Sequence, residues 1–147
     1  MLLTRLLACL TFIGNAEIAR ELIAMSGLKD FVTVIVAQSC EEAMEKINNL
    51  QHTYEKIDFL FLDHDKDSYL SDLQKMEEMN YIAKGSKVVA DNVLFAQISD
   101  YIDYCHKKQD QGKVSTRTIE CTVEYSEYEA KEYGLEKVKD GIEITMF

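Results

Sequence analysis

Acidic and amide side chains directly follow two apolar stretches of this sequence. The first stretch, FLFL at residues 59–62, runs into Asp63. The second, KVVA at residues 87–90, runs into Asp91 and Asn92. Carboxylate and amide oxygens are the ligands that hard cations such as Mg²⁺ prefer in proteins. The two motifs therefore predict a magnesium site with these three residues as ligands and with water or substrate in the remaining positions.

A lysine and a histidine stand close to Asp63 in the same stretch. A lysine beside a dication in a closed pocket has its pKa lowered, which would make Lys66 a usable base. The simpler interpretation is a solvated Lys66 that pairs with Asp65 or Asp67. His64 has three open interpretations: it stacks against a planar ligand, binds the metal or caps the turn.

The apolar periodicity alternates between strand and helix along the chain. Strands are predicted at residues 7–13, 31–37, 57–62, 86–91, 115–125 and 141–147. Helices are predicted from a cap at Asn15 to Gly27, after a cap at Ser39, at 70–83 and at 96–108, with a short charged helix before the last strand. This order predicts an α/β fold with a mostly parallel sheet and an antiparallel C-terminal addition.

The predicted sheet places both acidic motifs where such folds bind ligands, beyond the carboxyl ends of the strands. Taken alone, either motif is better explained by helix capping and turn formation, which are common roles of Asp and Asn. Both motifs at consecutive strand ends, with a lysine beside one of them, favour a ligand site.

Length and composition narrow the class of protein. The 147 residues suit a single domain, and the net charge of −10 excludes a typical nucleic-acid binder, which needs a basic surface. The four cysteines show neither zinc-site nor disulfide-framework spacing, so we expect free thiols in a reducing compartment.

No apolar run is long enough to span a membrane. Residues 1–16 read either as a strand that enters a helix or as a signal peptide, so we expect a cytoplasmic protein, with secretion as the alternative.

The motifs LDHDKDSYL and VVADNVL together resemble the cation-dependent O-methyltransferases, most closely the catechol O-methyltransferases. The resemblance continues in GLKDFVTVIVAQS and VEYSEYEAKEYGLEKV and covers nearly the whole chain from Asn15 onward. It implies a single Rossmann-like methyltransferase domain over residues 1–147. It also implies S-adenosylmethionine as the methyl donor, Mg²⁺ as the metal and a catechol-type substrate.

The resemblance also implies roles for individual residues. The three predicted magnesium ligands keep that role. Lys66 would accept the proton of a substrate hydroxyl, and Glu124 would hold the second hydroxyl of a catechol. Ser39, His64 and Asp63 would contact the methyl donor.

The sequence departs from the family pattern in its N-terminal part. Ile13 stands where the family has an acidic residue for the donor's ribose, and no E-L-G-x-x-x-G-type stretch is present. We therefore expect the family's first strand and its glycine-containing donor loop to be missing. The predicted strands at 7–13 and 57–62 would then either pair with each other or leave a divided sheet, whose open edge would allow self-association. The alternative function is a non-catalytic relic or interaction module that retains the fold and the metal site.

Overall fold

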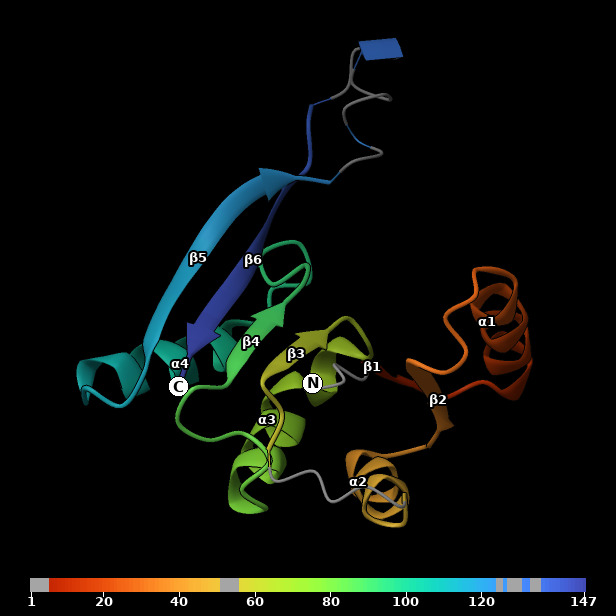
Figure 1. The fold of residues 1–147 in the computed structure, drawn as a ribbon. Helices are drawn as coiled ribbons and strands as arrows, with labels where there is room; N and C mark the ends of the chain where they lie inside the picture. The colour runs from red at the N-terminus through yellow and green to blue at the C-terminus, as the bar shows by residue number, and fades with distance from the viewer. Residues whose placement is uncertain (1–5, 51–55, 124–125, 127–130, 133–135) are drawn as a thin grey trace. The chain divides into compact units, whose positions relative to one another are not determined.

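The computed structural model describes residues 6–50, 56–123, 126, 131–132 and 136–147. The chain divides into two compact units, residues 1–54 and 55–147, which are described here one at a time (Figure 1). That all 147 residues form one domain stays a prediction.

The first unit is a strand–helix–strand–helix segment. Its elements are β1 (Leu6–Leu10), α1 (Ile13–Met25), β2 (Val32–Val36) and α2 (Cys40–Asn48). The two strands pair in parallel, with Leu6 opposite Val32 and Leu10 opposite Val36. The strand and helix types were predicted from the sequence, and Ser39 caps α2 as expected, because its hydroxyl accepts a hydrogen bond from the Glu42 amide at 3.2 Å.

Helix α1 differs from its prediction in two ways. It begins at Ile13, before the expected cap at Asn15, and the flanking Phe12 is extended with no side-chain cap. The predicted apolar face is not the buried one: Ala16 is the buried residue of α1, whereas Leu22 and Met25 are 60% and 84% exposed. Apolar residues occur on every side of this helix, so the periodicity does not specify which side is buried.

The second unit is a four-stranded sheet with two main helices. Its elements are β3 (Phe59–Leu62), the 3₁₀ turn η1 (Lys66–Ser68), α3 (Tyr69–Glu78), β4 (Lys87–Ala90), α4 (Ser99–Asp110), β5 (Ser115–Thr122) and β6 (Lys139–Met146). The strand order is β3-β4-β6-β5, with β3 and β4 parallel and β6 antiparallel to both of its neighbours. This arrangement confirms the predicted α/β class with an antiparallel C-terminal strand. Among the described residues the strands form two sheets, one in each unit. This corresponds to the divided sheet, one of the two arrangements expected from the sequence.

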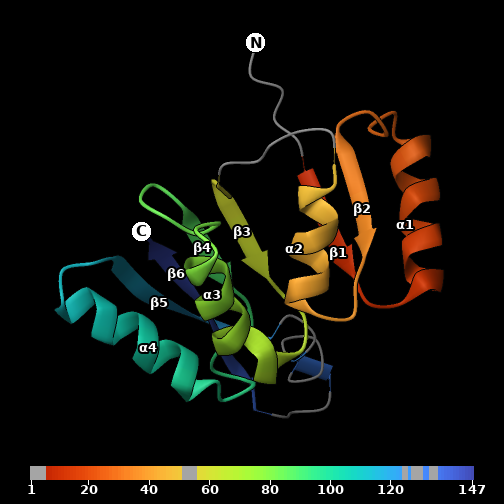
Figure 2. The ribbon, with the colours of Figure 1, turned by 90° about the horizontal axis from the view of Figure 1, so that it is seen from below.

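Helices α3 and α4 pack on one face of the four-stranded sheet, and Figure 2 shows both of them in front of the strands. The core on this face contains the fully buried side chains of Tyr69 and Tyr101, whose rings meet edge to face at 5.8 Å. Strand residues alternate as expected for a pleated sheet: Leu62 is buried, whereas Phe61 is 51% exposed.

Several element ends differ from the sequence prediction because residues adopt left-handed backbone conformations. Helix α3 ends at Glu78 because Asn80 has a φ of 60° and the chain turns there. Helix α4 starts at Ser99, after a loop in which Asn92 and Gln97 have φ values of 58° and 55°. The short charged helix expected before β6 lies mostly outside the described residues.

Candidate functional site

The two acidic motifs follow neighbouring strands at one edge of the second unit. Strands β3 and β4 are parallel, with Leu62 opposite Ala90, so Asp63 and Asp91 occupy the next positions on adjacent strands. The Asp91 amide donates a hydrogen bond to the Leu62 carbonyl at 3.0 Å, which continues the ladder to this point. The topology therefore brings together the two carboxylates that the sequence placed at consecutive strand ends.

Tyr69, which the sequence analysis did not assign to the site, connects the two strand ends. Its side chain is fully buried, and its hydroxyl lies 2.8 Å from the Leu62 carbonyl oxygen and 3.3 Å from the Asp91 carbonyl oxygen. The hydroxyl also accepts a hydrogen bond from the Lys66 ammonium at 2.8 Å. The signal in the sequence was a tyrosine three residues after Lys66 at the start of a helix.

Lys66 is held by both of these neighbours. Its ammonium donates to the Asp63 carboxylate at 2.8 Å as well as to Tyr69, and it lies 5.0 Å from the centre of the Tyr69 ring. Burial lowers the pKa of Lys66, but the hydrogen bonds to Asp63 and Tyr69 outweigh it, so the pKa is raised overall. Lys66 is therefore charged in this arrangement, and the lowering of its pKa that a bound dication would cause stays a prediction. Asp65 accepts from the Ser68 hydroxyl at 2.7 Å.

His64 is oriented by residues of α3. Its Nε2 lies 2.9 Å from a carboxylate oxygen of Asp72, and its ring lies 5.0 Å from the Tyr69 ring at a tilt of 32°. One face of the imidazole is thus close to Tyr69. Its stacking on a planar ligand stays a prediction.

Asn92 is anchored by a residue distant in sequence. Its amide nitrogen Nδ2 donates to Asp140 Oδ2 at 2.8 Å, and its backbone N–H donates to Asp91 Oδ1 at 2.9 Å. Asp140 is 3% exposed and lies in β6. Sequence analysis missed this residue, because nothing local in the sequence links it to Asn92.

The remaining predicted residues lie elsewhere. Ser39 belongs to the first unit, where its hydroxyl caps α2, so its contact with the methyl donor stays a prediction. Glu124 lies outside the described residues, and its predicted role is not tested.

The side-chain oxygens of the three predicted magnesium ligands suit a hard cation. One oxygen each of Asp63, Asp91 and Asn92 accepts no hydrogen bond from a described residue, because the observed bonds use Asp63 Oδ1, Asp91 Oδ1 and Asn92 Nδ2. Two carboxylates and one amide oxygen match the ligand preference of Mg²⁺. Within the described ranges, no group of three or more His, Cys, Asp and Glu side chains could hold a metal, so the predicted set depends on its amide.

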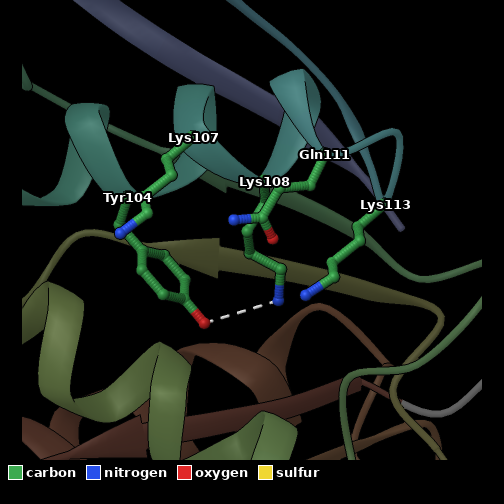
Figure 3. Close-up of a pocket in the computed structure, with 5 residues that line it drawn as sticks. All are labelled: Tyr104, Lys107, Lys108, Gln111 and Lys113. Atoms are coloured by element: carbon green, nitrogen blue, oxygen red, sulfur yellow. Dashed lines mark hydrogen bonds between the residues drawn. The ribbon is translucent and has the colours of Figure 1, made fainter.

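A separate depression of about 250 Å³ lies at the end of α4 (Figure 3). It is lined by Tyr104, Lys107, Lys108, Gln111 and Lys113. Lys108 forms an ion pair with Glu77 of α3, and its ammonium lies 5.1 Å and 5.0 Å from the centres of the Tyr104 and Phe147 rings. These contacts join α4 to α3 and to the C-terminal strand, and none of the predicted site residues takes part.

Comparison with known proteins identifies the family. The model of the O-methyltransferase family matches residues 4–145. The chain belongs to this family. It is 35% identical to catechol O-methyltransferase from Sus scrofa over 127 residues, which cover 84% of this chain and 62% of that protein. It is 32% identical to the Mus musculus enzyme over 134 residues, which cover 90% and 44%. The chain therefore spans less than two thirds of the length of these relatives.

Solved structures of O-methyltransferases share the fold. The enzyme from Bacillus cereus, solved in complex with SAH, superposes with a TM-score of 0.73 at 19% identity, over 96% of this chain and 61% of that one. TomG from Streptomyces achromogenes, solved in complex with SAM, gives 0.71 at 16% identity, over 97% and 61%. These similarities confirm the predicted Rossmann-like methyltransferase fold.

Among the described residues, no helix is both long and apolar enough to cross a membrane.

Proposed function

We propose that this protein transfers a methyl group from S-adenosylmethionine to a hydroxyl of a catechol-type substrate with the help of Mg²⁺. The observation that carries the proposal is the pairing of β3 with β4, which places Asp63 next to Asp91 and Asn92 in a chain of the O-methyltransferase family. The named relatives are catechol O-methyltransferases, which supports the substrate class.

Asp63, Asp91 and Asn92 would hold the magnesium ion through the oxygens that make no hydrogen bond within the described part of the chain. A bound dication supplies positive charge that lowers the pKa of a substrate hydroxyl. Glu124 would orient the substrate by accepting a hydrogen bond from its second hydroxyl.

Lys66 would accept the proton that the substrate loses. Its ammonium donates hydrogen bonds to Asp63 and Tyr69, so it first has to lose a proton to act as a base. A cation held by Asp63 would favour this loss, since two positive charges close together disfavour the ammonium. Tyr69 would keep the amine in place, because its own hydroxyl is fixed against the ends of β3 and β4.

The methyl donor would lie against His64 and Asp63, and the contact of Ser39 with the donor stays a prediction from the sequence. The donor would supply an electrophilic methyl group on a positively charged sulfonium. The substrate oxygen would take this methyl group as the carbon–sulfur bond breaks, and the electron pair left on sulfur would give neutral S-adenosylhomocysteine as the leaving group. The proton of the hydroxyl ends on Lys66.

Binding of the methyl donor tests the proposal. Calorimetry should detect binding of S-adenosylmethionine that strengthens with Mg²⁺, and transfer of labelled methyl to a catechol should follow. The comparisons favour a methyltransferase over the non-catalytic alternative. Absence of donor binding at millimolar concentration, with or without Mg²⁺, would reverse that preference.

A further inference from the structure

Asp140 is a buried carboxylate with three hydrogen-bond donors around it. It is 3% exposed and accepts from Asn92 Nδ2 at 2.8 Å, from the Phe95 amide at 3.1 Å and from the Gly141 amide at 2.7 Å. Burying a carboxylate is costly unless such donors replace the water it loses. Two of its three donors belong to the loop that follows β4, so Asp140 joins this loop to β6.

The chemistry of this contact fixes the orientation of the Asn92 amide. An ionised carboxylate only accepts hydrogen bonds, so Asn92 has to present its NH₂ group to Asp140. The amide oxygen of Asn92 then faces away from Asp140 and accepts no hydrogen bond from the described residues. An amide whose orientation was free would offer either its oxygen or its NH₂ group, and the NH₂ group is no ligand for Mg²⁺.

The backbone around the contact is also fixed. The Val93 amide donates to the Gly141 carbonyl at 2.9 Å, beside the bond from Phe95 to Asp140. Gly141 permits this close approach, because a Cβ there would lie 2.8 Å from Leu94 Cδ1 and 3.1 Å from the Ile119 carbonyl oxygen. Asn92 itself has a φ of 58°, a conformation that asparagine tolerates better than most residues. Residues 140–141 thus hold the side chain of Asn92 and the backbone amides of Val93 and Phe95, which follow it in the same loop.

We propose that Asp140 is a positioning residue of the magnesium site, which keeps the Asn92 oxygen turned outward as a ligand. This inference rests on the proposed function, because it assumes that Asn92 binds the metal. Asp140 itself would not bind the cation, because both of its oxygens accept hydrogen bonds from the protein. Partners of this kind orient metal ligands, and their loss typically costs about 10–100-fold in metal affinity.

The decisive variant is Asp140→Asn. Its retained oxygen still accepts from the Phe95 and Gly141 amides, so the fold should be kept. Its new NH₂ group faces the NH₂ group of Asn92, and the Asn92 amide has to rotate by about 180° to accept a hydrogen bond. That rotation replaces the outward oxygen by a nitrogen that cannot bind Mg²⁺.

The double variant Asn92→Asp with Asp140→Asn reverses the polarity of the contact. One oxygen of the new carboxylate at position 92 accepts from the amide at position 140, and the other oxygen faces outward again. The net charge equals that of the wild type. Asp103→Asn is the matched control for the single variant, since it also removes one carboxylate, at an exposed position of α4.

Calorimetry with Mg²⁺ and electron paramagnetic resonance with Mn²⁺ measure the result, with circular dichroism as a check of folding. Asp140→Asn should bind both ions about 10–100-fold more weakly, Asp103→Asn should match the wild type, and the double variant should recover binding. Wild-type affinity in a folded Asp140→Asn protein overturns the inference and leaves the magnesium site standing. No binding of either ion by the wild type overturns the magnesium site and the inference together. If Asp140→Asn fails to fold, the folded double variant decides, and its failure to bind overturns the inference.

Discussion

The hydroxyl of Tyr69 lies 2.8 Å from the ammonium of Lys66, and the same hydroxyl faces the backbone at the ends of both β3 and β4. One buried side chain of α3 therefore links the proposed base to the two strands that carry the proposed metal ligands. The position of Lys66 depends on this link as well as on Asp63.

Tyr69→Phe should lower the free energy of unfolding by about 1 kcal/mol, the typical net contribution of a buried hydrogen bond. Tyr101→Phe is the matched control, because Tyr101 is equally buried but its hydroxyl makes no hydrogen bond of normal geometry to any described residue. Removing that hydroxyl should leave stability unchanged or slightly raise it. Urea denaturation of both variants measures the difference, and equal losses would show that the Tyr69 contacts contribute no specific stability.

Lys66→Met should abolish turnover of a catechol, with a loss of about 10²–10⁴-fold in rate, the usual contribution of a general base. Stability should change little, because Asp63 is 51% exposed and such an ion pair contributes at most about 1 kcal/mol. Magnesium and donor binding should be nearly retained. The measurements are single-turnover methyl transfer and calorimetry, with Lys107→Met as the control for loss of a lysine. Turnover within a few-fold of the wild type would contradict a role as base.

Asp91→Ala should remove magnesium binding, since it deletes one of the two proposed carboxylate ligands. The substitution also removes the acceptor of the Asn92 backbone amide, so folding has to be checked by circular dichroism. Calorimetry with Mg²⁺ on the wild type and the variant gives the comparison. Equal affinities would eliminate Asp91, and with it the proposed site.

The convergence of Asp63 and Asp91 was predictable from the sequence because it follows from a simple rule. Two consecutive apolar strands with a helix between them pair in parallel, and their carboxyl ends then meet at the same edge. The cap at Ser39 was equally local, since a side-chain oxygen and an amide three residues later suffice to form it.

The contact between Asn92 and Asp140 was not predictable in this way. The two residues lie 48 positions apart, and they meet only because β6 enters the sheet beside β4 in the antiparallel direction. The buried side of α1 was missed for a different reason, because a helix that is apolar on every side gives no periodic signal.

Stability should fall as the pH rises from about 9 to 11, because Cys105 is buried in α4. Burial is the main cause that raises the pKa of its thiol from 9.0 to about 11. Between these values the unfolded chain loses the thiol proton while the folded protein keeps it, so a higher pH favours unfolding. The full effect of about two pKa units corresponds to roughly 3 kcal/mol. Below pH 9 the thiol is protonated in both the folded and the unfolded state, so no stability is lost there. Cys105→Ala should be less stable at neutral pH because of the cavity, but its stability should fall less steeply over this range. Urea denaturation at several pH values, with the exposed Cys121→Ala as control, compares the slopes. Parallel slopes for the wild type and Cys105→Ala would show that this thiol does not titrate differently in the folded protein.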